Sequence, residues 1–148
     1  EIHPYNKIPD ISPDVKGVIL SGSPSSVRDA DSPDVHLAAF RHKLPLLGIC
    51  YGAQLLAHSS GGEVRASAIR EYGRAKLGTV NADSPLMRGL DQHSQVWMSH
   101  ADTITTVPDN FRIIASTDTV RVAAFEVEGR TGPPSHLPTR PSRSCGKN

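Results

Sequence analysis

The clearest indication of a reactive site in this sequence is the spacing of Gly48, Cys50 and Gly52. These residues follow a short apolar run and precede an apolar helical pattern. A nucleophile held at a sharp turn between a strand and a helix has this layout, which is called a nucleophile elbow. Side chains two positions before or after the nucleophile would collide with the neighbouring backbone, so both places need glycine. The first turn of a helix also favours the thiolate, the reactive form of cysteine. The pattern therefore predicts that Cys50 is a nucleophile and that the backbone N–H of Tyr51 stabilises an oxyanion.

Cys50 also has a simpler interpretation, as a small buried residue at the end of a core strand. Free cysteine is among the most buried residue types, and a glycine two positions away on each side does not decide the matter. The apolar stretch 44–47 before the cysteine and the helical pattern from Gln54 after it favour the elbow. We therefore interpret the site as one built for nucleophilic chemistry.

A second candidate for oxyanion stabilisation lies at Gly22 and Ser23. Residues 15–20 have the pattern of a buried strand, and glycine and small residues follow directly in 21–27. Such a loop can turn backbone N–H groups towards a ligand. By itself the segment has the pattern of an ordinary turn at the end of a strand. Beside an elbow it becomes a candidate for the second oxyanion donor.

The expected elements place these residues in an α/β fold. Ser32 and Pro33 have the pattern of a helix N-terminus, and the helix is expected to end near Lys43. The elbow strand and its helix follow, so the alternation of strands and helices predicts a parallel sheet with helices on its faces. Later β-rich runs are expected as antiparallel or mixed strands added to that sheet, at 75–80, 95–99, 111–115 and 120–127.

Length and composition restrict the class of protein. A chain of 148 residues suits one domain, and the core is expected to be aliphatic because 37% of the residues are hydrophobic and only 5% aromatic. No apolar run is long enough to span a bilayer and residues 1–4 do not open like a signal peptide, so we expect no membrane association and a cytoplasmic location. The two cysteines, Cys50 and Cys145, predict neither a disulfide framework nor a zinc site.

The basic residues are concentrated near the C-terminus. Four basic residues and no acidic one follow Glu128, and without them 12 basic residues face 15 acidic ones, a balance of −3. This mildly acidic body argues against a nucleic-acid partner. From Gly129 onwards Gly, Pro, Ser, Thr and Arg dominate the sequence. We therefore expect one domain over residues 1–128 and a divergent, disordered tail over residues 129–148.

Four blocks of the sequence occur in a characteristic order and spacing: Ser21–Val27, Gly48–Gln54, Arg70–Gly73 and Trp97–Asp102. Together they resemble the class I glutamine amidotransferase family over about residues 1–128, in the branch found in GMP synthetases. The resemblance implies a flavodoxin-like fold of three layers, with a mostly parallel sheet and flanking helices. It also implies a reaction in which cysteine attacks the side-chain amide of glutamine, ammonia leaves, and water hydrolyses the thioester.

The resemblance also implies a partner for this reaction. In the family the ammonia passes to a synthetase domain or subunit, which uses ATP and magnesium to convert xanthosine monophosphate (XMP) to GMP in purine biosynthesis. The amidotransferase domain itself needs no cofactor and no metal. The chain is thus expected to bind glutamine and a synthetase partner.

Transferred by position, the resemblance gives particular residues a role. Cys50 is the nucleophile, and the N–H groups of Tyr51 and of the Gly22–Ser23 turn form the oxyanion hole. The residues implied to hold glutamine are Gln54, Ser99, His100, Ala101 and Asp102. Glu71 and Tyr72 would line the mouth of the site. Simpler interpretations stay open: Gln54 as a solvent-facing helix residue, His100 as a hydrogen-bonded residue at a strand end, and Trp97 as core packing.

The sequence departs from the family pattern in three places. The strand and helix that open the family's domain have no counterpart, and Ala101 stands where the family usually has glycine. The family's general base is a histidine in a Phe-His-Pro-Glu type block. Here His136 lies near the expected position without a preceding strand or a carboxylate to orient it. We therefore expect a domain that is incomplete at both ends and has little or no glutaminase turnover.

Two other functions stay open at this point. A cysteine hydrolase of a related α/β type would need another histidine as its base, and the candidates are His36, His42, His58, His93 and His100. A non-catalytic remnant that binds a synthetase-like partner would need no base at all.

Overall fold

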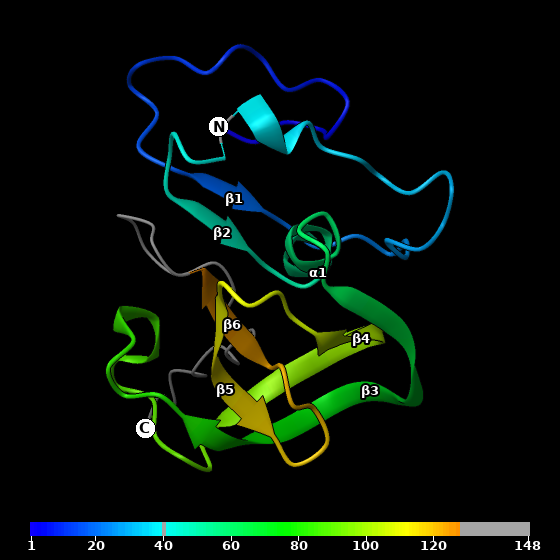
Figure 1. Cartoon of the computed structure of the whole chain (residues 1–148), viewed down its shortest axis with the longest axis vertical. Helices are drawn as coiled ribbons and strands as arrows, with labels where there is room; N and C mark the ends of the chain where they lie inside the picture. The colour runs from blue at the N-terminus through cyan, green and yellow to red at the C-terminus, as the bar shows by residue number, and fades with distance from the viewer. Residues whose placement is uncertain (40, 128–148) are drawn as a thin grey trace, which may run out of the picture.

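A computed structural model describes residues 1–39 and 41–127, apart from the side chains of residues 68–71 and 100. The expected tail 129–148 with His136, and the expected domain boundary at Glu128, lie outside the described residues. The described elements form a small parallel sheet and a larger antiparallel sheet, and the helix α1 (Tyr51–His58) lies between them (Figure 1). This arrangement confirms the α/β class.

The small sheet consists of β1 (Val18–Leu20) and β2 (Leu46–Gly48), which run parallel. Val18 lies opposite Leu46 and Leu20 lies opposite Gly48. Because α1 begins directly beyond β2, the parallel pair delivers residues 49 and 50 to the helix N-terminus. Both strands were predicted from their apolar runs. Ile19, the middle residue of β1, is 66% exposed.

The connection between the two parallel strands differs from the prediction. A helix was expected from Ser32 to near Lys43, but the described residues of this segment form only the 3-10 turn η1 (Leu37–Ala39). Val35 and Leu37 are buried, so the apolar spacing reflects packing against the core. A helix of about ten residues gains little from its own backbone hydrogen bonds unless tertiary packing supports a whole face.

The larger sheet has the strand order β4-β3-β5-β6 and is antiparallel throughout its described pairings. Its strands are β3 (Glu63–Val80), β4 (Gln95–Thr106), β5 (Phe111–Thr117) and β6 (Ala124–Val127), with the 3-10 turn η2 (Pro85–Met87) between β3 and β4. The predicted runs 75–80, 95–99 and 111–115 fall on these strands, whereas of the run 120–127 only residues 124–127 form a strand. These strands form a sheet of their own, whereas they were expected to extend the parallel sheet.

A wide bulge interrupts the long β3–β4 ribbon. Ala66 lies opposite Asp102 and Glu71 lies opposite His100, so residues 67–70 of β3 face the single residue Ala101 of β4. Bulges bend a strand and interrupt its ladder. Residues 63–74 have no sustained alternation of apolar and polar residues, so the first part of β3 was not predicted.

Two apolar clusters hold the elements together. The first joins α1 to the parallel pair and to the larger sheet, and it includes Leu20, Leu46, Leu56, Val64 and Phe125. The rings of Phe111 and Phe125 stack with their centroids 5.0 Å apart. The second cluster lies between η2 and the antiparallel sheet and includes Leu77, Met87, Val96 and Ile114. The aliphatic composition thus supplies most of the core, as expected.

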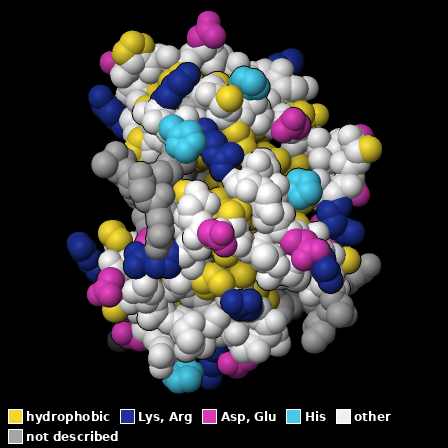
Figure 2. Space-filling model, viewed as in Figure 1, with side chains coloured by type: hydrophobic (Ala, Val, Ile, Leu, Met, Phe, Trp, Pro, Cys, Tyr) yellow, Lys and Arg dark blue, Asp and Glu magenta, His cyan; other side chains and the backbone are white. Residues whose placement is uncertain are grey.

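The surface carries charges of both signs. Figure 2 shows basic and acidic side chains interspersed over one face, with apolar side chains visible between them. Within residues 1–39 and 41–127, none of the helices has the length and the hydropathy that crossing a membrane requires.

Candidate active site

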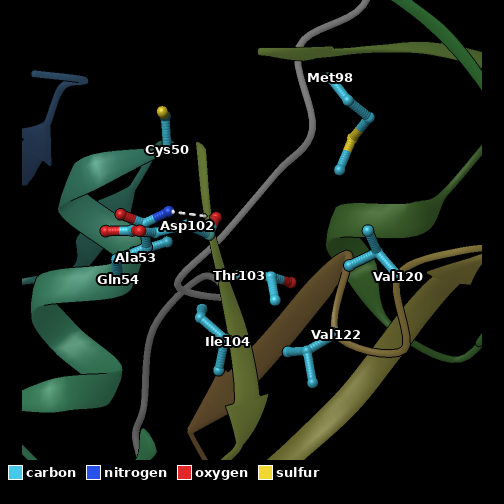
Figure 3. Close-up of a pocket in the computed structure, with 9 residues that line it drawn as sticks. All are labelled: Cys50, Ala53, Gln54, Met98, Asp102, Thr103, Ile104, Val120 and Val122. Carbon is cyan, nitrogen blue, oxygen red and sulfur yellow. Dashed lines mark hydrogen bonds between the residues drawn. The ribbon is translucent and has the colours of Figure 1, made fainter. Parts of the chain in front are cut away.

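Cys50 occupies a strained corner between β2 and α1. Its backbone φ is 54° and its ψ is −114°, a left-handed conformation that non-glycine residues seldom adopt. The N–H groups of Ala53 and Gln54 donate to its carbonyl oxygen at 3.0 and 3.1 Å and so begin the helix. The thiol makes no capping hydrogen bond to α1. Cys50 therefore stands at a sharp bend with its side chain directed away from the helix backbone, as Figure 3 shows.

The two glycines beside this corner are required by close backbone contacts. A Cβ atom on Gly48 would lie 2.8 Å from the Ala53 nitrogen, and one on Gly52 would lie 2.4 Å from the Leu20 carbonyl oxygen. Real Cβ atoms essentially never approach other atoms so closely. The steric prediction for both glycines is confirmed: the close contact lies between β2 and α1 at Gly48, and between α1 and β1 at Gly52.

Two backbone segments face the Cys50 side chain. The thiol donates a weak hydrogen bond to the carbonyl oxygen of Ser99 on β4, with Sγ and O 3.8 Å apart. A Cβ atom placed on Gly22 would lie 3.5 Å from the Cys50 Cβ and 3.8 Å from its Sγ. The predicted oxyanion loop and the predicted glutamine-binding segment of β4 are thus both brought to the thiol.

The backbone N–H groups of Gly22, Ser23 and Tyr51 donate to no acceptor within the described part of the chain. The Tyr51 side chain is buried, and its hydroxyl donates to the carbonyl oxygen of Pro33 at 2.5 Å. The phenol therefore anchors the helix while the N–H of the same residue stays available at the helix start. These are the three amides that the sequence assigned to an oxyanion hole for Cys50.

Gln54 and Asp102 lie side by side near the thiol and are joined to each other by a hydrogen bond. The Gln54 side-chain amide donates to the backbone carbonyl of Asp102 at 3.0 Å, and both residues are buried. The interpretation of Gln54 as a solvent-facing helix residue is therefore wrong. The hydrogen bond joins α1 to β4 next to the thiol (Figure 3).

The other predicted residues lie along the same ribbon. Ser99 and Ala101 are exposed, and Tyr72, which pairs with Ser99 across the ribbon, is 62% exposed. The side chains of Glu71 and His100 lie outside the described part. Trp97 is 42% exposed, with the Arg74 guanidinium 6.0 Å from its ring centroid, so the expectation of core packing for Trp97 is wrong.

A small cavity adjoins the thiol. Its volume is about 20 Å³, which is room for about one water molecule. Its lining combines polar groups of α1 and β4 with apolar side chains of β4 and of the turn before β6: Cys50, Ala53, Gln54, Met98, Asp102, Thr103, Ile104, Val120 and Val122 (Figure 3). Glutamine is larger than this cavity, so its binding requires the lining to widen.

Sequence reasoning missed Ser26 and Arg28, whose side chains reach the Asp102 carboxylate. The Ser26 hydroxyl donates to one carboxylate oxygen, and the Arg28 guanidinium lies 3.0 Å from the other. One signal could have indicated them: a carboxylate next to the elbow, such as Asp102, is expected to be buried, and a buried charge needs partners.

Among the described side chains, no histidine ring forms a hydrogen bond with Cys50, and no three residues of the types that bind metals form a group that could hold an ion.

Comparisons with known proteins identify the architecture around the thiol. The family model of the class I glutamine amidotransferases matches residues 1–131. A GMP synthase (glutamine-hydrolyzing) of Cytophaga hutchinsonii is 61% identical over 129 residues, which are 87% of this chain and 25% of that protein. The corresponding protein of Phocaeicola vulgatus is 54% identical over 128 residues, again 25% of its length. The chain thus spans about a quarter of the length of the curated relatives it matches.

Solved structures of similar fold point to the same family. A glutamine amidotransferase from Methylobacillus flagellatus superposes with a TM-score of 0.64 at 26% identity, over 82% of this chain and 51% of that one. A glutamine amidotransferase from Thermotoga maritima gives a TM-score of 0.51 at 26% identity, over 57% of this chain and 36% of that one. The chain belongs to the class I glutamine amidotransferase family, as these matches show together with the elbow at Cys50 and its flanking glycines.

Proposed function

We propose that Cys50 is the nucleophile of a glutamine-hydrolysing site. The observation that carries this proposal is the left-handed corner at Cys50, which brings its thiol within 3.8 Å of the Ser99 carbonyl and next to Gly22. The thiolate would form a bond to the side-chain carbonyl carbon of glutamine. The resulting oxyanion would accept hydrogen bonds from the amides of Tyr51, Gly22 and Ser23. The C–N bond then breaks, ammonia leaves with an added proton, and water hydrolyses the thioester to glutamate.

The glutamine would bind at the small cavity beside Cys50. In this proposal Gln54, Ser99, His100, Ala101 and Asp102 hold it, and the cavity lining widens to admit its side chain. The Gln54–Asp102 hydrogen bond supports the proposal because it already fixes β4 beside the thiol. Ala101 lies opposite the β3 bulge, where the ladder between β3 and β4 is interrupted.

The released ammonia would serve a synthetase domain or subunit. The similar proteins of Cytophaga hutchinsonii and Phocaeicola vulgatus are named GMP synthases, and three quarters of their length lies outside the matched segment. We place ATP and magnesium in that remaining part, where XMP would be aminated to GMP. A cytoplasmic location would suit this pathway.

We expect the chain itself to turn over glutamine slowly. Proton transfer to the departing ammonia needs an acid–base group held near Cys50. In the sequence, no strand is predicted directly before His136, and no carboxylate lies beside it. Binding of glutamine and reactivity of the thiol do not require that group.

The test separates binding from turnover. The rate of iodoacetamide alkylation at Cys50 is measured by mass spectrometry in a Cys145→Ser background, with increasing glutamine or with asparagine, which is one methylene shorter. We expect glutamine to protect the thiol in a saturable manner and asparagine to protect it much less. Equal effects of the two amino acids would contradict the glutamine site. Sustained ammonia release that Cys50→Ala abolishes would contradict the slow turnover.

A further inference from the structure

One buried carboxylate joins the loop after β1 to β4. The Asp102 side chain is 7% exposed and forms an ion pair with the Arg28 guanidinium at 3.0 Å. Its other oxygen accepts a hydrogen bond from the Ser26 hydroxyl. A buried carboxylate without such partners would be costly, so the loop and the strand depend on one another at this point.

The direction of the Ser26 hydrogen bond is fixed by its surroundings. The Arg28 backbone N–H donates to the Ser26 hydroxyl oxygen at 3.2 Å, which leaves the hydroxyl proton for Asp102. The Ser26 N–H in turn donates to the Asp29 carboxylate at 3.1 Å. Val27, between the two contact residues, is 6% exposed and belongs to the apolar cluster around α1. The loop is therefore folded on itself and attached to the body by both polar and apolar contacts.

The same strand segment holds the other groups around the thiol. The Asp102 backbone carbonyl accepts the Gln54 amide, and the carbonyl of Ser99, three residues earlier, faces the Cys50 sulfur. Gly22, four residues before Ser26, lies against the Cys50 side chain. A displacement of the loop relative to β4 would therefore move the Gly22–Ser23 amides relative to the thiol.

We propose that Ser26 and Arg28 form a latch on Asp102 that sets the position of the Gly22–Ser23 amides against Cys50. In this role Arg28 is a positioning residue, because its guanidinium contacts Asp102 and lies outside the cavity lining. The latch depends on one part of the proposed function, namely that Cys50 attacks a carbonyl carbon. It does not require the carbonyl to belong to glutamine.

The latch is tested with two reagents that both react with Cys50, of which only one forms an oxyanion. With p-nitrophenyl acetate the thiolate forms an S–C bond, negative charge develops on the carbonyl oxygen, and p-nitrophenolate leaves with the electron pair of the broken C–O bond. With iodoacetamide the thiolate displaces iodide directly, and no oxyanion forms. Both rates are measured on the full chain in a Cys145→Ser background, after subtraction of the rate of Cys50→Ala in the same background.

Arg28→Ala is expected to slow acylation by roughly tenfold to hundredfold. This is less than the roughly hundredfold to thousandfold loss of rate on removal of a whole oxyanion donor, because the amides are displaced and not removed. Alkylation by iodoacetamide is expected to stay within about twofold, since it needs no donor for a developing oxyanion. Arg28→Lys keeps a cation and is expected to recover much of the acylation rate. Arg88→Ala, which removes an exposed arginine elsewhere, serves as the matched control and is expected to leave both rates unchanged.

Three outcomes would overturn the latch: an unchanged acylation rate in Arg28→Ala, an equal fall of both rates, or no recovery in Arg28→Lys. Because no glutamine is present, these outcomes are independent of the protection experiment above. Failure of glutamine protection with an intact Arg28 effect would remove the glutamine site and keep the latch.

Discussion

Gly52→Ala tests the contact between α1 and β1 most directly. The added Cβ atom would lie 2.4 Å from the Leu20 carbonyl oxygen and 2.6 Å from the Leu20 Cβ. Ordinary van der Waals contact begins at 3.4 Å, so the helix and the strand must separate by about 1 Å. Both obstructing atoms belong to the backbone or lie next to it. No rotation of a side chain can therefore relieve the contact.

The expected loss of stability follows from three contributions. Overpacking a close contact costs about 1–3 kcal/mol. The hydrogen bond from the Ile49 N–H to the Leu20 carbonyl, 2.8 Å long, would be stretched beyond its normal range at a cost of about 1 kcal/mol. Alanine regains about 1 kcal/mol through its higher helix propensity. The net loss is about 1–3 kcal/mol, which lowers the Tm by roughly 2–12 °C in a chain of this size.

Thermal and urea unfolding followed by circular dichroism measure this loss. Gly78→Ala is the matched control, because its Cβ would meet Ser116 and Thr117 at 3.5 Å and 3.6 Å, which is ordinary contact. We expect Gly78→Ala to change the free energy of unfolding by about 0.5 kcal/mol or less. If Gly52→Ala were as stable as the control, α1 would not pack against β1 as described.

Three further changes test the strain, a buried hydrogen bond and a surface charge. Cys50→Gly should be about 1 kcal/mol more stable than Cys50→Ala in urea unfolding, because only glycine adopts a φ of 54° without penalty, and equal stabilities would argue against a strained corner. Gln54→Ala should lower the free energy of unfolding by about 1–3 kcal/mol, since it leaves the buried carbonyl of Asp102 without its donor, and a neutral effect in a thermal melt would refute this bond. Arg65→Ala should raise the pKa of Glu63 towards its ordinary value, because the Arg65 hydrogen bond is the main cause that lowers it, as an NMR titration of the carboxylate would show. A lowered pKa adds stability above the ordinary pKa that disappears as the pH falls, but Glu63 is too exposed for unfolding experiments to detect it.

The elbow could be predicted from sequence because local sterics decide it. A cysteine two residues from a glycine on each side, after an apolar run and before a helical pattern, leaves few other backbone arrangements. The helix around Gln54 and its neighbouring strands were predicted for the same reason. At Gly48 and Gly52 the structure shows the close contacts that make glycine necessary.

Features that depend on distant partners could not be read from local pattern. The helix expected from Ser32 to Lys43 is replaced by a short turn, because Val35 and Leu37 pack into the core without a continuous helical face. The first part of β3 was missed because the bulge opposite Ala101 breaks the alternation that indicates a strand. Arg28 was missed because its partner Asp102 lies 74 residues away in the sequence.

The parallel pair also affects how the protein behaves at high concentration. Within the described strands, β1 pairs only with β2, so the other edge of β1 offers backbone donors and acceptors beside the exposed side chain of Ile19. Such an edge can accept a strand from another molecule, and natural sheets often guard it with charge or proline. We therefore expect samples to self-associate reversibly as they are concentrated, and a lysine in place of Ile19 to keep them monodisperse.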